Sequence, residues 1–247
     1  MRCMYIDFSS LFHQSSKDRS GQGRVRIPLE TAKYPPEWKS LSYKTYPRLE
    51  KKPLDPLQRS EGVFKTISTR RSSHNFSRRQ LTLAEISAVL KYSGGIVHAT
   101  KGEAHRAQPS GGALYPIEMY PIVFSGSSEI PAAVYHYNVK DHALDVLWER
   151  AFTKEYLSTL FTYPWAQDAS LAIVLTGVFD RNQIKYGERG YRQILIEAGA
   201  IMQNVYLVAQ ELGLQCTAID GVNEPNIEKL LDIDGVSESA LCSILIG

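Results

Sequence analysis

The chain has 247 residues, of which 43% are hydrophobic and 22% charged, and its formal net charge is +2. This length and composition fit a globular protein with one large or two small domains. The near-neutral charge argues against nucleic acid as the main partner. The three cysteines (Cys3, Cys216 and Cys242) form no Cys-x-x-Cys pair, so we expect neither a disulfide framework nor a metal site.

No apolar run indicates a secretion signal or a membrane span. Asp7, His13, Lys17 and Asp18 interrupt the early residues, and no stretch approaches ~18 consecutive apolar residues. We therefore expect a cytoplasmic protein that does not engage a membrane.

Residues 1–60 differ from the rest of the chain in charge. They hold 12 Lys and Arg against 6 Asp and Glu, and six of the twelve prolines, without a sustained apolar period. We predict a basic, Tyr/Pro-rich N-terminal arm at 1–60, with short helical pieces that pack on the body or on a partner. A single domain at 61–247 follows.

The first predicted elements of that domain are two helices. A short one begins near Leu57 and ends at Thr69, and a stronger one covers residues 83–92. Thr82 and Glu85 stand at capping-box spacing, and Gly94-Gly95 ends the second helix.

Strands are predicted next, at residues 118–124, 133–137 and 143–148, the last two as a hairpin. The continuous apolar run 171–178 indicates a central strand buried on both faces. A long helix over 191–212 follows from the period of Ile194, Ala198, Ile201 and Val205. Strands at 214–219 and 241–246 flank a helix at 226–231. Helices and strands mix without strict alternation, which favours an α+β fold.

Several common signatures are missing: Gly-x-Gly-x-x-Gly after a strand, Walker A, His-Glu-x-x-His and Gly-x-Ser-x-Gly. Four other stretches carry candidate chemistry. The first reads Pro109-Ser110-Gly111-Gly112-Ala113-Leu114-Tyr115-Pro116. Its glycines permit close approach of backbone N–H groups to a ligand, and its prolines stiffen the loop. A plain reverse turn explains the glycines equally well.

The second stretch, residues 69–76, places Arg70, Arg71, Ser72 and His74 together. Guanidinium groups match phosphate oxygens, so these residues form a candidate phosphate clamp. The alternative is a solvated basic corner.

The third stretch contains Lys185 and Tyr186, whose pKa values burial or a nearby charge can bring into range for proton transfer. A lysine on a surface turn beside a packed tyrosine is the simpler interpretation. The fourth stretch comprises Gln203-Asn204 and residues 212–221. If the adjacent amides of Gln203 and Asn204 are buried they need partners, which an aromatic ligand or the protein itself can supply.

The order and wording of these stretches resemble the nitroreductase superfamily, and within it the SagB-type dehydrogenases. The resemblance covers about residues 60–247. It implies a mostly antiparallel central sheet surrounded by helices, FMN as cofactor, and an intertwined homodimer with FMN sites at the interface.

The resemblance also assigns residues to FMN. Arg70, Arg71, Ser72 and His74 would hold the phosphate and ribityl chain. The flavin ring would contact Pro109, Ser110, Gly111, Gly112, Leu114 and Asn204. Ile219-Asp220-Gly221 is similar to the Ile-Glu-Gly of common nitroreductases, in which a backbone N–H reaches flavin N5.

Lys185-Tyr186 matches the pair that acts in azoline-oxidising members of the group. The resemblance thus implies dehydrogenation of thiazoline or oxazoline rings to thiazole or oxazole in a natural-product pathway. The implied partners are a cyclodehydratase and a precursor peptide or carrier-bound substrate. Two alternatives stay open: an NAD(P)H-dependent nitro or quinone reductase, and a non-catalytic docking subunit of a biosynthetic complex.

Overall fold

The computed structural model describes residues 7–18, 43–44, 46–54, 61–100 and 102–247. Its helices are α1 (Phe8–Ser16), α2 (Gly62–Thr69), α3 (Leu83–Gly94), α4 (Lys154–Leu160), α5 (Phe179–Tyr186), α6 (Glu188–Glu211) and α7 (Glu224–Leu231), with short 3-10 turns at Gly111–Ala113 and Pro164–Asp168. Its strands are β1 (Ile96–Thr100), β2 (Glu103–Arg106), β3 (Ile117–Val123), β4 (Ala133–Asn138), β5 (Ala143–Glu149), β6 (Leu171–Val178), β7 (Cys216–Ile219) and β8 (Glu238–Ile246).

Six strands form one sheet in the order β5-β4-β3-β6-β8-β7, with every neighbouring pair antiparallel. The hairpin β1–β2 is a separate two-stranded sheet. The predicted α+β fold with a mostly antiparallel sheet is therefore confirmed.

Alternating side chains of the central strand β6 enter two different cores. Leu171, Ile173 and Leu175 pack in the core that contains residues of α3 and α6. Ala172 and Val174 pack in the core that contains residues of α4 and α7. Because successive side chains of a strand point to opposite faces, helices cover both faces of the sheet. The prediction that residues 171–178 are buried on both faces is confirmed.

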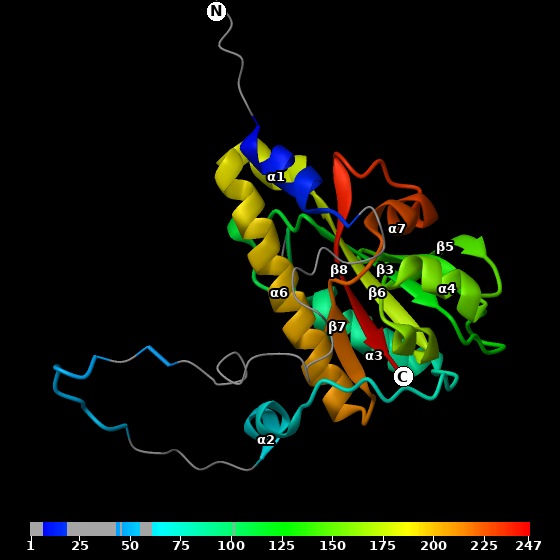
Figure 1. Ribbon diagram of the computed structural model, residues 1–247, viewed down its shortest axis with the longest axis horizontal. Helices are drawn as coiled ribbons and strands as arrows, with labels where there is room; N and C mark the ends of the chain where they lie inside the picture. The colour runs from blue at the N-terminus through cyan, green and yellow to red at the C-terminus, as the bar shows by residue number, and fades with distance from the viewer. Residues whose placement is uncertain (1–6, 19–42, 45, 55–60, 101) are drawn as a thin grey trace, which may run out of the picture.

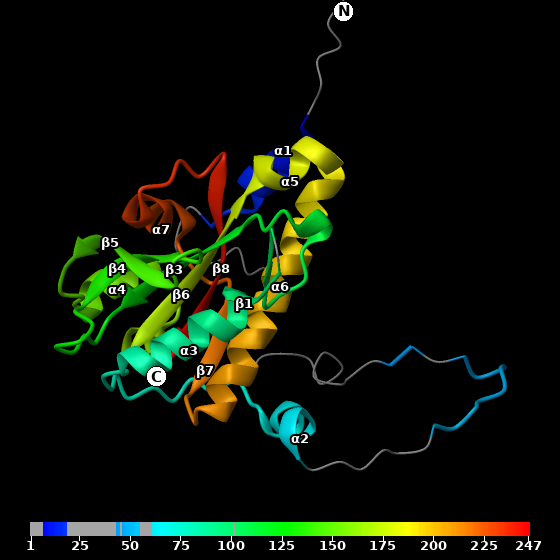
Figure 2. The same cartoon turned by 180° about the vertical axis from the view of Figure 1, so that it is seen from behind.

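The long helix α6 runs along one side of the sheet, with α1 near its first residues and α2 near its last (Figures 1 and 2). Ile194, Ala198, Ile201 and Val205 form its buried stripe, as their spacing predicted. The capping box of α3 is also present, with Thr82 and Glu85 bonding each other's backbone N–H groups.

Three features were not predicted from the sequence: α4, α5 and the β1–β2 hairpin. Every residue of β1 after Ile96 is exposed, so that strand has no alternating apolar pattern. The eight residues of α5 bury only Phe179 and Asn182. Both elements thus lack the periodic burial from which helices and strands are predicted.

The arm predicted at 1–60 lies mostly outside the described residues, but its helix α1 is described. Asp7 caps α1 by accepting from the N–H of Ser10 at 2.9 Å. Lys17 follows the helix, and its Nζ lies 2.7 Å from Glu228 of α7 in a buried ion pair. This part of the arm therefore packs on the body of the same chain. Among the described residues, no helix combines the length and apolar character needed to cross a membrane.

Candidate functional site

The glycine loop at residues 109–116 is strained where its donors are expected. Gly112 has φ +69°, and Ala113 and Tyr115 have φ values of +54° and +47°. Left-handed backbone is unfavourable for residues that carry a Cβ and concentrates at functional sites. The loop is held by Ser110, whose Oγ accepts from the N–H of Tyr115 at 2.9 Å. The sequence predicted a stiff loop that permits close approach of its glycines, and the left-handed residues are an additional finding of the structure.

The loop lies against the predicted proton-transfer pair. A Cβ added to Gly112 would lie 2.6 Å from Tyr186 Oη and 3.0 Å from Lys185 Nζ. The two side chains also contact each other, with Lys185 Nζ 5.2 Å from the centre of the Tyr186 ring. Glycine at 112 is therefore needed for both its φ and its lack of a side chain. Folding brings two of the four candidate stretches together here.

Helix α1 braces the turn that carries Lys185 and Tyr186. Glu188, just after the turn, accepts from the N–H groups of Phe8 (3.1 Å) and Ser9 (2.8 Å). Gln183, just before the pair, donates its Nε2 to Ser9 Oγ at 2.8 Å. The start of α1 thus joins α5 to α6 on either side of the pair. Nothing in the sequence pattern indicated this role for the arm.

A buried polar network, also missed by the sequence analysis, lies beneath the glycine loop. Gln108 donates to Glu197 Oε1 at 3.0 Å, and burial raises the pKa of the Glu197 carboxyl. Asn182 donates to Gln193 Oε1 at 3.1 Å, and a Cβ on Gly111 would collide with that oxygen. The available signal was the pair of polar residues Gln193 and Glu197, which stand at i,i+4 beside the apolar stripe of the helix.

The predicted phosphate residues gather around Tyr206, near the other end of α6. The guanidinium carbon of Arg70 lies 5.0 Å from the centre of the Tyr206 ring. Ser72 Oγ lies 3.0 Å from Tyr206 Oη, which also accepts from the N–H of Ala218 at 2.7 Å. Arg71 donates to the carbonyls of Ser68 and Arg70. In the described part of the chain, no carboxylate lies within 4.0 Å of either guanidinium.

His74 lies on an aromatic stack rather than beside Arg70. Its ring stacks on Trp165 with centres 4.0 Å apart, and Trp165 stacks on Tyr163 at 5.1 Å. A Cβ on Gly221 would lie 2.5 Å from the Tyr163 ring. The stack therefore connects His74 to the stretch Ile219-Asp220-Gly221, in which Ile219 is buried and Asp220 exposed.

Asn204 has a partner within the protein. Its Nδ2 donates to the carbonyl of Ser93, at the end of α3, at 3.2 Å. The protein itself therefore supplies a hydrogen-bond acceptor for the Asn204 Nδ2 group, which is one of the two possibilities that the sequence left open. Gln203, its neighbour, is exposed.

The candidate residues form two groups along α6. The glycine loop, Lys185 and Tyr186 lie near Gln193, whereas Arg70 and Ser72 lie at Tyr206. At 1.5 Å per residue, Gln193 and Tyr206 are about 20 Å apart along the helix axis. Within one chain, the residues predicted for proton transfer and those predicted for phosphate binding thus lie near opposite ends of α6.

Other reactive groups offer little competing chemistry. Burial raises the pKa values of the Cys216 and Cys242 thiols to about 12, so neither forms a thiolate nucleophile near neutral pH. Within the described ranges, no cluster of His, Cys, Asp and Glu side chains could hold a metal ion.

Two relatives are named as processing proteins, one of trifolitoxin and one of microcin B17. The chain is 33% identical over 177 residues to the trifolitoxin-processing protein TfxB of Rhizobium leguminosarum bv. trifolii, covering 68% of this chain and 47% of that protein. It is 30% identical over 191 residues to the microcin B17-processing protein McbC of Escherichia coli, covering 69% of this chain and 68% of that protein. The chain thus spans about half the length of the first relative.

The fold is also found among solved structures. A chain of the E. coli microcin synthetase McbBCD complex with truncated pro-MccB17 bound superposes with a TM-score of 0.73 at 22% identity, over 96% of this chain and 90% of that one. At this identity the similarity shows the fold alone. Residues 67–247 match the nitroreductase family. The chain therefore belongs to the nitroreductase family, as its motifs indicated.

Proposed function

We propose that this protein is an FMN-dependent oxidoreductase that dehydrogenates thiazoline or oxazoline rings in a peptide to thiazole or oxazole. The observation that carries the proposal is the close approach of Gly112 to Lys185 and Tyr186, whose side chains lie where a Cβ at position 112 would be. It places candidate proton acceptors against a loop whose backbone has no side chain to hold a flat ligand away. The relatives TfxB and McbC, named as processing proteins of trifolitoxin and microcin B17, support a peptide substrate.

The residues present suit FMN. Arg70 and Arg71 lack carboxylate partners within the described ranges, and Ser72 adds a hydroxyl, so this group matches a phosphate. At Gly111 and Gly112 the loop passes so close to Gln193, Lys185 and Tyr186 that a Cβ would collide with them. The loop from Pro109 to Leu114 would line the flavin ring. The flavin ring would also be bordered from the side of Arg70 and Ser72, by His74, Asn204 and Ile219-Asp220-Gly221.

The separation of the two groups along α6 supports a homodimer in which one copy supplies the loop and the other the phosphate site. Apolar side chains of α6 and α2 are open to such a partner. Leu195 and Ile196 are 41% and 68% exposed, and Val63 and Ile67 are 56% and 53% exposed. No atom lies within 4 Å of a Cβ placed on Gly199, so the α6 backbone is also accessible. Burying these residues against a second copy would stabilise the pair.

In this proposal, bound FMN supplies the two-electron oxidation by accepting the electron pair as a hydride, and the protein supplies orientation and a proton acceptor. Lys185 Nζ and Tyr186 Oη both lie close to the Cβ position of Gly112, so either group, as the neutral amine or the phenolate, would take the proton from the substrate ring carbon. The α1 contacts to Glu188 and Gln183 hold this pair in place. A cyclodehydratase that makes the azoline, and the precursor peptide that carries it, are the proposed partners.

The decisive experiment combines flavin reconstitution with turnover of a thiazoline-containing peptide. Lys185→Ala and Tyr186→Phe should retain FMN, and one of them should lose about 10²–10⁴-fold in kcat, the usual contribution of a general base. Lys140→Ala, in the exposed β4–β5 turn, is the control. Wild-type turnover in both variants would refute the assigned role.

Two further readouts separate the alternatives. Rapid bleaching of the flavin by NADPH, followed by menadione reduction without azoline turnover, would favour a nitro or quinone reductase. A colourless protein that binds no FMN would favour a docking subunit.

A further inference from the structure

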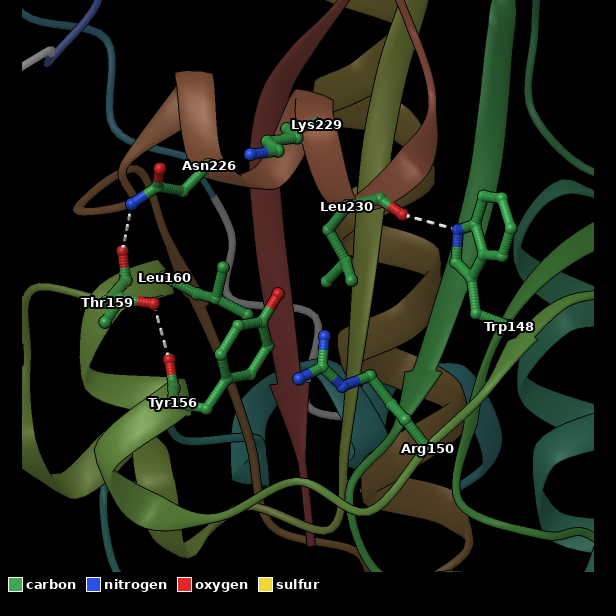
Figure 3. Close-up of a pocket in the computed structure, with 8 residues that line it drawn as sticks. All are labelled: Trp148, Arg150, Tyr156, Thr159, Leu160, Asn226, Lys229 and Leu230. Atoms are coloured by element: carbon green, nitrogen blue, oxygen red, sulfur yellow. Dashed lines mark hydrogen bonds between the residues drawn. The ribbon is translucent and has the colours of Figure 1, made fainter.

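A hollow of about 610 Å³ lies between β5, α4 and α7, and none of the candidate residues lines it (Figure 3). β5 and β7 are the opposite edge strands of the six-stranded sheet. Neighbouring strands lie about 4.8 Å apart, so β5 is about 24 Å from β7. The predicted phosphate-binding residues Arg70 and Ser72 lie beside β7. The volume of the hollow falls within the usual range of ligand-binding clefts.

The floor and one wall of the hollow are apolar. Leu160 and Leu230 are 0% and 7% exposed and form the floor. Trp148 stands beside them, with its Nε1 donating to the carbonyl of Leu230 at 2.9 Å (Figure 3). That bond orients the indole, yet the side chain stays 48% exposed. A rigid exposed aromatic beside an apolar floor is typical of contact surfaces for another polypeptide.

Two cations stand at the rim. The guanidinium of Arg150 lies 3.8 Å from the centre of the Tyr156 ring, and Lys229 stands on α7 across the hollow (Figure 3). Within the residues that the structure describes, no carboxylate lies within 4.0 Å of either. By contrast, Lys154, also on α4, is paired with Asp168 at 2.5 Å.

We propose that this hollow docks a segment of a separate polypeptide in which a carboxylate side chain stands next to an aromatic or aliphatic one. The carboxylate would pair with Arg150 and Lys229, and the apolar side chain would pack on Leu230 and Trp148. An Arg that is already stacked on a ring loses little freedom on pairing, which favours it as an anchor. The inference does not depend on the flavin, so it can hold or fail independently of the proposed function.

The binding test uses the full chain and two fluorescein-labelled octapeptides, one alternating Asp and Phe and the other alternating Asn and Phe. Fluorescence anisotropy should show at least about tenfold tighter binding of the acidic peptide, equivalent to about 1.4 kcal/mol. The double variant Arg150→Gln/Lys229→Gln should bring the two peptides to within about twofold of each other. Lys154→Gln should leave the preference intact.

A second measurement localises the peptide. Binding of the acidic peptide should change the intrinsic tryptophan fluorescence, and Trp148→Phe should abolish that change, whereas Trp165→Phe should retain it. Melting temperature and near-UV circular dichroism of each variant check that it is folded.

Equal affinity of the two peptides would overturn the proposal, because only the apolar floor would then contribute. An equal loss in Lys154→Gln would also overturn it, since general charge attraction would be sufficient. No binding up to about 1 mM, the weak limit for a specific contact, is the third refuting outcome.

Discussion

The two ends of α6 present opposite kinds of polar chemistry. At its start several side chains pair with one another: Gln108 with Glu197, Asn182 with Gln193, and Glu188 with the start of α1, while Gln108 Oε1 and Asn182 Oδ1 have no hydrogen-bond partner among the described residues. Towards its end, Arg70 stacks on Tyr206 without a carboxylate partner in the described ranges. At the first end, side chains of the protein bond each other without a ligand. At the second end, the Arg70 guanidinium has no carboxylate partner in the described ranges and can bind an anionic ligand.

This difference suggests how a single helix can serve two tasks. In the proposed function, proton transfer by Lys185 or Tyr186 would need a fixed geometry, to which the contacts of α1 with Glu188 and Gln183 contribute. Phosphate binding would need a cation without a carboxylate partner, which is the role proposed for Arg70. Substitutions at the two ends should therefore have separable effects, on turnover at one end and on cofactor affinity at the other.

After the loss of turnover expected for Lys185→Ala or Tyr186→Phe, the next largest expected effect is on cofactor affinity. Arg70→Ala should weaken FMN binding by about 10–100-fold, because a hydrogen bond to a charged group contributes about 1.5–3 kcal/mol. Riboflavin, which lacks the phosphate, should bind the variant and the wild type alike. Flavin fluorescence titration measures both, with Arg79→Ala, an exposed residue paired with Glu85, as control. An equal loss for riboflavin would assign Arg70 to the ring instead.

A smaller effect, of about tenfold on turnover, is expected from Gly112→Ala. Its Cβ would displace Lys185 or Tyr186. Gly213→Ala is a matched control, because Gly213 has the same φ of +69° but no atom within 4 Å of an added Cβ. Both variants carry about 1–2 kcal/mol of backbone strain. Similar turnover in the two would show that the contact at Gly112 has no role.

The smallest expected effect is a pH dependence of stability at the α1 end. His13 of α1 bonds Tyr191 and Ser239, and burial together with Lys17 lowers its pKa from 6.5 to about 4. Between pH 6.5 and 4, His13 is protonated in the unfolded chain but not in the folded one. The free energy of unfolding should therefore fall as the pH drops from 6.5 to 4.

Urea unfolding across this pH range measures the effect. The wild-type midpoint should fall more steeply than that of His13→Gln, while exposed His98→Gln should follow the wild type. Parallel slopes for His13→Gln and the wild type would contradict the assignment. His13→Gln should leave FMN affinity unchanged, because His13 lies beside the first residues of α6, away from the proposed phosphate residues Arg70 and Ser72.

The sequence predicted elements whose burial is periodic and local. The stripe from Ile194 to Val205, the apolar run of β6 and the capping box at Thr82 all appear in the structure. It did not predict the exposed β1–β2 hairpin or α5, because neither has a buried face wide enough to produce a pattern. It also began the long helix at Tyr191, whereas α6 begins at Glu188 after the left-handed Gly187.

The sequence by itself determined which chemical groups are available and in what order: a glycine loop, an Arg-Ser stretch, a Lys-Tyr pair and the family to which they belong. Only the tertiary structure decided which of them meet. Gly112 contacts Lys185, Arg70 stacks on Tyr206, and Ser9 bonds Glu188. These contacts join residues far apart in the chain, and their partners are selected by packing of whole elements rather than by any local pattern.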